Sequence, residues 1–217
     1  MRQLRWPAAT LEFNKLTLDV EDVTLLNAWW NLRWAVHLDP AKVFHASLSG
    51  RLTPDSGKVG SLYLAETTNT SFYEIYGDDM AAAKEAGTPF AISESAMKER
   101  VYATTEPPPP LRLYDLTSEG SAKAIGMDLA TLYSAKVEYP RQFAQRLHDH
   151  SNRFDGIRYI SRHTQGACVV LWPTYNAALQ KLSLTRYNRL WDHATFSPAL
   201  PPGYLQIFDD SVGTASP

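Results

Sequence analysis

The stretch GSLYLAETTNTSFYEIYGD, residues 60–78, decides the centre of the fold, because it joins a short apolar strand to a helix. Residues 61–65, SLYLA, follow a glycine and predict the strand. Residues 69–77 have helical periodicity. The apolar stripe of this helix consists of Phe72, Ile75 and Tyr76. Glu74 falls outside the stripe, so the sequence predicts a helix that carries a glutamate on its polar face.

Apolar stretches on both sides of this unit predict the remaining elements. Upstream, residues 21–34 place apolar side chains about one turn apart, which predicts a helix within an N-terminal helical segment of about residues 1–40. The short apolar run at 43–47 predicts a strand. Downstream, a helix is expected from Pro140 to about His150, since proline suits a first helical position. The strands predicted downstream cover residues 98–105, 111–116, 154–161 and 167–172.

These elements outline one domain over residues 1–217, of mixed α/β or α+β type, and we take it as α+β, built on a small mixed sheet. The length suits one core, and 44% hydrophobic with 20% charged residues is an ordinary globular composition. Four prolines at 107–110 favour an extended spacer within the domain. The tail, about residues 197–217, is expected to be poorly ordered at its end.

The charge balance favours a small-molecule ligand. A formal net charge of -2 leaves no global positive field for nucleic acid or an anionic membrane. The single cysteine, Cys168, cannot form an internal disulfide, and its apolar strand favours a core residue over a nucleophile. The longest apolar run, residues 167–172, is too short to cross a bilayer. We therefore expect a cytoplasmic protein without a membrane span.

Several familiar motifs are absent, namely G-x-G-x-x-G, the P-loop, H-E-x-x-H and G-x-S-x-G. His148 and His150 are two positions apart on a predicted helix, so they point to different sides and make a poor metal pair. We expect no metal site. Residues 184–193, LTRYNRLWDH, mix arginine with aromatic residues, a combination that can bind nucleic acid. A strand with one polar face gives the same pattern, and the net charge favours that interpretation.

Three stretches of the chain, taken together, resemble the RES-domain family, which is named for an arginine, a glutamate and a serine. They are SGRLTP at 49–54, the segment 60–78, and FDGIRYISR at 154–162. In the family, a strand ending in LYLA precedes a short helix with a glutamate, which corresponds to Glu74 here. The family also has the pattern D-G-x-x-Y-x-S-R before an apolar strand, and its last two places are Ser161 and Arg162.

The resemblance implies a fold similar to that of the ADP-ribosyltransferases. It implies a toxin that consumes NAD as a substrate, by hydrolysis, phosphorolysis or transfer to a protein. It also implies a protein partner, an antitoxin of the Xre type, and leaves a homodimer open. Which acceptor receives the ADP-ribose part of NAD is not given by the resemblance.

Glu74 is the first candidate for catalysis. Breaking the nicotinamide–ribose bond places positive charge on the sugar, and a carboxylate beside the ribose stabilises that charge and orients the acceptor. Periodicity alone favours a solvated glutamate on the polar face of a helix. The flanking motif is what favours a site residue.

Arg51 and His45 are the candidates for binding the phosphates of NAD. Arg51 has the planar donor fork that grips a pyrophosphate in two places, and its alternative role is that of a surface arginine. Many family members carry an arginine directly after an aromatic residue on the first strand, where this chain has Phe44 and His45. His45 could take that role when protonated, although a lone histidine on a strand is more typical of the core.

Tyr63 and Ser161 complete the candidate site. Tyr63 could stack on the nicotinamide or hydrogen-bond its ribose, whereas a tyrosine in a short strand is more often a core residue. Ser161 closes a strand and could hydrogen-bond the ribose or the amide, or serve only as a turn residue. The catalytic set is then Glu74, Arg51 and Ser161, and the NAD-binding set is Arg51, Tyr63, His45 and Ser161.

Two other hypotheses stay open beside an NAD-consuming enzyme. The chain could be a catalytically inactive interaction protein that keeps the RES fold, or a nucleic-acid-binding module. Release of nicotinamide from NAD separates the enzyme from the inactive protein. Salt-dependent binding to an oligonucleotide would identify the nucleic-acid-binding module.

Overall fold

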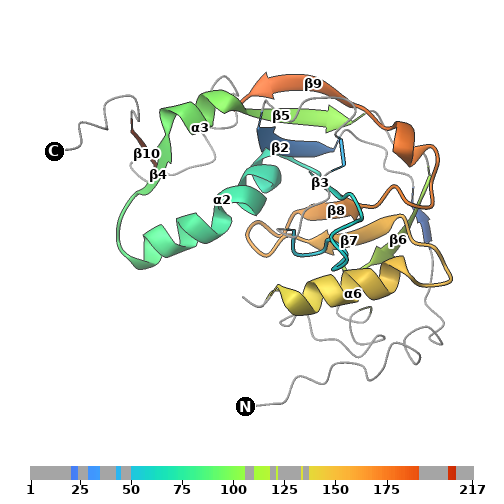
Figure 1. Cartoon of the computed structure of the whole chain (residues 1–217). Helices are drawn as coiled ribbons and strands as arrows, with labels where there is room; N and C mark the ends of the chain where they lie inside the picture. Colours follow the sequence, from blue (N-terminus) through green and yellow to red (C-terminus); the bar gives the residue numbers. More distant parts are fainter. Residues whose placement is uncertain are drawn as a thin grey trace, which may run out of the picture.

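Two sheets and a small number of helices make up the part of the chain that the computed structural model describes (Figure 1). The main sheet has eight strands in the order β1-β6-β7-β8-β3-β2-β5-β9, and β10 pairs with β4 in a separate two-stranded sheet. The described residues are 21–23, 29–34, 43–44, 50–105, 110–117, 121, 133, 137–190 and 205–208.

Neighbouring strands of the main sheet are antiparallel, except β6 and β7, which are parallel. Its strands are β1 (Glu21–Val23), β2 (Trp30–Trp34), β3 (Leu62–Ala65), β5 (Arg100–Thr105), β6 (Leu111–Asp115), β7 (Gly156–Ile160), β8 (Ala167–Leu171) and β9 (Leu184–Arg189). The two-stranded sheet pairs β4 (Phe90–Ser93) with β10 (Leu205–Phe208) in parallel. The helical segments are α2 (Thr68–Glu85), α3 (Glu94–Glu99), α6 (Glu138–His148) and the 3-10 turn η3 (Leu179–Lys181).

The two longer helices cover different parts of the main sheet. Helix α6 lies beside β6, β7 and β8, and α2 lies beside β2 and β3 (Figure 1). The buried side chains under α6 include Phe143 and Leu147, which pack with Ile157 and Val170. Burial of each such side chain stabilises the fold by roughly 1.5–3 kcal/mol. The sheet under the two helices is therefore a rigid base for side chains at its edge.

Helix α2 begins and ends at residues with clear local causes. Thr67 is the N-cap, and its hydroxyl accepts a hydrogen bond from the Thr70 N–H at 3.0 Å. The helix ends before Gly87, whose φ of +67° is a conformation that L side chains rarely adopt. One face of α2 buries Phe72, Tyr76 and Met80. Glu74 lies on the exposed side of the helix, as its position outside the apolar stripe predicts.

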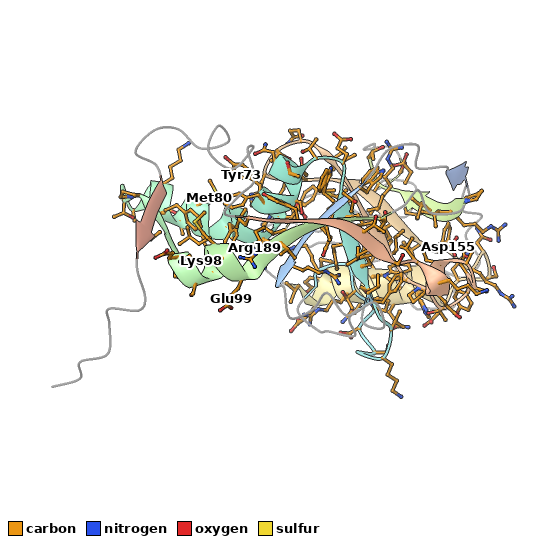
Figure 2. The ribbon with its side chains drawn as sticks, turned by 90° about the horizontal axis from the view of Figure 1, so that it is seen from above. Tyr73, Met80, Lys98, Glu99, Asp155 and Arg189 are labelled. Carbon is orange, nitrogen blue, oxygen red and sulfur yellow. The ribbon has the colours of Figure 1, made fainter. Side chains whose placement is uncertain are left out.

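A buried carboxylate joins β6 to the segment after β8. Asp155 Oδ2 accepts hydrogen bonds from the Arg112 N–H at 2.9 Å and from Asn176 Nδ2 at 3.2 Å. Figure 2 shows that Asp155 lies at the opposite end of the molecule from Lys98 and Glu99 of α3. Its role is therefore to hold the far end of the sheet together, away from α2 and α3.

Most of the predicted elements are confirmed, as is the α+β class. The main sheet is larger than the small sheet expected. The helix predicted at 69–77 extends to Glu85, and the helix predicted from Pro140 begins earlier, at Glu138. The strands predicted at 61–65, 98–105, 111–116, 154–161 and 167–172 correspond to β3, β5, β6, β7 and β8.

The helix predicted at 21–34 is wrong, because residues 21–23 and 30–34 form β1 and β2. Trp30 and Trp34 belong to the predicted helical stripe but, with Leu32 between them, they also fit an alternating strand, and pairing with β5 decides between the two. Of the strand predicted at 43–47, residues 43–44 form a bend and 45–47 lie outside the described residues. Residues 1–20 of the predicted helical segment, and the tail other than β10, also lie outside them.

Candidate functional site

Both carboxylate oxygens of Glu74 accept hydrogen bonds from the end of β7. The Tyr159 hydroxyl donates to Oε2 at 2.9 Å, and the Ser161 hydroxyl donates to Oε1 at 2.7 Å. Tyr159 and Ser161 are two positions apart along an extended segment, so their side chains point to the same face. Two side-chain donors therefore hold the carboxylate of Glu74 in place, although Glu74 as a residue is exposed.

The surroundings of Tyr159 and Ser161 keep both hydroxyls as hydrogen-bond donors to Glu74. Burial, followed by the charge of Glu74, raises the pKa of Tyr159 well above its ordinary value, so the phenol stays protonated at neutral pH. Ser161 is 0% exposed, and its Oγ accepts a hydrogen bond from the His163 N–H at 3.2 Å. Since the hydroxyl has one hydrogen, that hydrogen is the one donated to Glu74.

The turn between β7 and β8 packs directly on α2, which brings Ser161 to Glu74. Ser161 N–H donates to the Gly166 carbonyl at 2.8 Å and closes the turn. The hydroxyl of Thr164 donates to Thr70 Oγ1 of α2 at 3.0 Å. A Cβ added at Gly166 would lie 2.3 Å from that same Oγ1, so only glycine permits the approach.

Arg51 lies in a turn that is tied to β3 and to α6. The Tyr63 hydroxyl accepts the Leu52 N–H at 2.8 Å and lies 3.1 Å from Thr53 Oγ1. Arg141 of α6 donates its Nε–H to the Gly50 carbonyl at 3.3 Å. The turn therefore has fixed contacts on both sides of Arg51.

The electrostatic surroundings of Arg51 include Glu74. Burial lowers the pKa of the Arg51 guanidinium, and the charge of Arg162 lowers it further, while Asp78 and Glu74 act in the opposite direction. The fold thus brings Arg51, Glu74 and Ser161, three residues from distant parts of the sequence, into one neighbourhood. A guanidinium suits an anionic group of a ligand, and an oriented carboxylate suits a part of the same ligand where positive charge develops.

Tyr63 uses its hydroxyl to support the turn that carries Arg51. Burial is the main cause that raises the pKa of Tyr63 to about 12, so its hydroxyl also stays protonated. The ring is half-buried and packs against the core under α6. Its contact with a ligand stays a prediction.

The first strand differs from the one assumed from the sequence. Val43 and Phe44 lie in a bend, and His45 lies outside the described residues. The first strand of this region is β2, and it carries an arginine, Arg33. Arg33 is 6% exposed, and its Nη2 donates to the Val43 carbonyl at 3.1 Å.

Arg33 lies on the sheet face that points away from Tyr63. The pairing of Trp30 with Ala65, continued along β2, places Arg33 level with Leu62. Leu62 belongs to a different buried cluster from the one that Tyr63 contacts. Arg33 is therefore not part of the Glu74 neighbourhood.

Three residues around Glu74 were not predicted as part of the site, namely Tyr159, Asp78 and His163. Tyr159 was within reach of sequence reasoning, because it precedes Ser161 by two positions in the quoted motif. Asp78 of α2, which pairs with Arg162, gave no signal, because an exposed acidic residue on a helix is common. His163 contacts both Arg162 and Ser161 and also escaped notice.

The structure also bears on the cysteine, metal and membrane predictions. Cys168 is buried in the core under α6, and burial raises the pKa of its thiol, so it is a core residue as expected. Within the described ranges, no group of three or more metal-ligating side chains could hold an ion. None of the helices described is long and apolar enough to cross a membrane.

The comparison with known families decides the classification. A family model described as the RES domain matches residues 28–192, which is most of the chain. The chain belongs to the RES-domain family. The matched region of this RES-domain protein runs from just before β2 to just after β9 and includes Arg51, Glu74 and Ser161. The resemblance drawn from the sequence is thereby confirmed.

Comparison with solved structures agrees with the fold. A chain in the crystal structure of the M. tuberculosis MbcT–MbcA toxin–antitoxin complex is similar to this RES-domain protein, with a TM-score of 0.54. The sequences are 15% identical over 78% of this chain and 86% of that chain, so the likeness concerns the fold alone. No curated protein matches the sequence.

Proposed function

We propose that this RES-domain protein binds NAD and breaks its nicotinamide–ribose bond, with Glu74 as the catalytic carboxylate. The observation that carries the proposal is the orientation of Glu74, whose two oxygens are held by Tyr159 and Ser161. A solvated helix glutamate has no need of two side-chain donors from a distant strand. Glu74 is an exposed residue of α2, and we infer that a substrate can approach it.

The charges of the site suit the charges of NAD. The pyrophosphate of NAD is an anion, and Arg51 offers a half-buried guanidinium whose planar fork binds phosphate oxygens in pairs. Arg51 and Glu74 influence each other electrostatically. We infer that the pyrophosphate contacts Arg51 while the nicotinamide ribose lies against Glu74.

Glu74 would act mainly on the transition state. As the nicotinamide leaves, positive charge builds up on the ribose, and a carboxylate beside it lowers the energy of that charge. Its other task would be to orient the acceptor that attacks the ribose, as carboxylates do in glycoside cleavage. Ser161 and Tyr159 fix the carboxylate in advance, so little reorganisation is needed when the bond breaks.

A protein partner forms part of the proposal. The similar solved chain comes from a toxin–antitoxin complex, and the sequence resemblance implies an antitoxin of the Xre type. We infer that this protein is a toxin that acts on NAD in the cytoplasm and is restrained by such an antitoxin. Co-expression with the product of a neighbouring open reading frame, followed by co-purification, would test the partner.

Release of nicotinamide tests the proposed activity directly. The purified protein is incubated with NAD, with and without inorganic phosphate, and the products are separated by chromatography. We expect nicotinamide together with ADP-ribose, a phosphorylated ADP-ribose, or labelled protein, which identifies water, phosphate or a protein as the acceptor. NAD that stays intact over hours in all conditions would contradict the proposal and favour an inactive interaction protein.

A further inference from the structure

A second cluster of side chains lies next to Glu74 and Ser161 and has no part in the chemistry proposed above. Its members are Gly77 and Asp78 on α2, and Arg162 and His163 directly after Ser161. The cluster connects the same two segments that the hydrogen bond between Glu74 and Ser161 connects. We call these four residues the Arg162 cluster.

Arg162 makes contacts through all three nitrogens of its guanidinium. Its Nε–H donates to Nε2 of His163 at 3.2 Å, and Nη1 donates to the Tyr133 carbonyl at 3.3 Å. Nη2 contacts both carboxylate oxygens of Asp78. A guanidinium holds its donors in a rigid plane, so three partners in three directions fix its orientation.

His163 transmits this orientation to Ser161. Its backbone N–H donates to Ser161 Oγ, and its ring accepts the hydrogen bond from Arg162. Burial, followed by the charge of Arg162, lowers the pKa of His163, so the ring is neutral at neutral pH and Nε2 can act as acceptor. The His163 ring also packs on Gly77, where an added Cβ would lie 2.5 Å from its Cγ.

We propose that Arg162 is a positioning residue that keeps the Ser161 hydroxyl directed at Glu74. The inference rests on the proposed function, in which Glu74 is the catalytic carboxylate. Asp78 is exposed, so its ion pair with Arg162 contributes little to stability. The geometry suits orientation better: Arg162, the residue after Ser161, contacts Asp78 of α2, and the two segments meet at the Glu74–Ser161 hydrogen bond.

The first test is Arg162→Lys. Lysine keeps the positive charge near Asp78, but its single nitrogen cannot reach three partners in three directions. We expect kcat to fall by up to about 10-fold, no more than removal of the Ser161 hydroxyl itself would cause, because small displacements of catalytic groups lower the rate markedly. KM should stay within about twofold. A rise in KM with unchanged kcat would mean that Arg162 binds the phosphates of NAD, and would overturn the proposal.

A double-mutant cycle with Ser161→Ala tests the route of the effect. If Arg162 acts through Ser161, then Arg162→Lys should change kcat by less than about twofold when Ser161 is already alanine. If the double variant instead lost kcat by the product of the two single losses, the two residues would act independently, which would contradict this route. The matched control is Arg153→Lys, at an exposed arginine whose guanidinium lies over the ring of Tyr175, and its kcat should equal that of the wild type.

A structural readout separates this inference from the proposed function. Crystal structures of the wild type and of Arg162→Lys give the distance from Ser161 Oγ to Glu74 Oε1, which is 2.7 Å in the native arrangement. We expect this hydrogen bond to be lost in the variant. An unchanged distance would overturn the positioning role even if NAD is cleaved. Wild-type protein that leaves NAD intact would instead refute the proposed function, and the distance would still decide the role of Arg162.

Asp78→Asn is the second variant, for the case that Arg162→Lys does not fold. The amide keeps the size of the side chain and removes the charge that attracts Nη2 of Arg162. We expect a smaller fall in kcat in the same direction, with KM unchanged. A kcat equal to that of the wild type, together with the native Ser161–Glu74 distance, would overturn the proposal.

Discussion

The hydroxyl of Ser161 donates a 2.7 Å hydrogen bond to Glu74 Oε1, although the two residues are 87 positions apart in the chain. One comes from the exposed side of a helix and the other from the end of a buried strand. A bond between them can only arise if the turn after β7 packs on α2. Substitutions at this contact and around it separate its catalytic use from a purely structural one.

Glu74→Gln should abolish most of the turnover and leave the fold and most of the affinity for NAD intact. Glutamine keeps the size and part of the hydrogen bonding, but it removes the negative charge that stabilises the ribose cation. Loss of one such group typically lowers kcat by ~10²-fold or more. The measurements are the NAD cleavage rate and the thermal midpoint of the wild type and the variant.

The matched control for this change is Glu85→Gln, at the exposed last residue of the same helix. It should leave both the rate and the thermal midpoint close to the wild-type values, as surface changes usually do. If Glu74→Gln also cleaved NAD at the wild-type rate, Glu74 would be a surface residue of α2 and the proposed chemistry would lose its main support.

Ser161→Ala should reduce kcat by roughly 10-fold, a smaller effect than that of Glu74→Gln, because Tyr159 still holds the other oxygen of the carboxylate. Loss of the hydrogen bond should lower the free energy of unfolding by about 0.5–1.5 kcal/mol. Steady-state kinetics and urea denaturation give the two values. A loss of stability without any loss of rate would assign Ser161 a structural role only.

Arg51→Lys should weaken NAD binding although the charge is kept, since a lysine cannot contact two phosphate oxygens in one plane. The expected loss is on the order of 1–3 kcal/mol of binding free energy, the size of a charge-assisted hydrogen bond. Titration calorimetry measures it, with the inactive Glu74→Gln protein as background so that NAD is not consumed. An unchanged affinity would mean that a residue other than Arg51 binds the phosphates, and His45 would be the first to be tested.

The strand β3 and the helix α2 that follows it could be predicted, because the sequence signals for both elements are local. An apolar run ending in LYLA, a threonine cap and an apolar stripe are each visible within twenty residues. The glutamate and the serine of the site followed from the family motif. Tyr159 could have been added, because alternation along a strand places it on the face of Ser161.

Other parts depend on contacts between distant segments, and sequence patterns do not contain them. Residues 30–34 were predicted as helix, yet they form β2 because β3 and β5 pair with them on both sides. The contact of Arg162 with Asp78 joins a half-buried arginine to an exposed carboxylate of a kind that occurs on many surfaces. The support that Tyr63 gives to the Arg51 turn also depends on how closely this turn lies to β3 in space.

The pH dependence of stability should include a contribution from His163. Burial and Arg162 hold its pKa below the ordinary value of 6.5, although Glu74 and Asp78 oppose the shift, and Arg51 adds to it. The unfolded chain therefore binds a proton at pH values where the folded His163 does not. This contribution is fully present above pH 6.5 and is lost as the pH falls through 6.5 toward the lower folded pKa.

Urea denaturation of the wild type and of His163→Gln between pH 8 and pH 5 measures this contribution, since the other histidines are common to both proteins. The difference in unfolding free energy between the two should shrink as the pH is lowered. A difference that is constant over this range would mean that the His163 pKa is the same in the folded and unfolded states.

Gly77→Ala is expected to destabilise the protein, although alanine is the better helix former by about 0.8–1 kcal/mol. The added Cβ would lie between 2.5 and 2.7 Å from three atoms of the His163 ring, so the ring must move away from α2. Overpacking of this kind costs typically 1–3 kcal/mol, which exceeds the gain in helix propensity. His163 donates its N–H to Ser161, so the shift should also lower kcat.

Asn69→Ala, at an exposed position of the same helix, is the control that gains helix propensity without a clash. Thermal denaturation and NAD cleavage are measured for both variants. A Gly77→Ala protein as stable and as active as Asn69→Ala would show that the ring of His163 has room to move without disturbing Ser161.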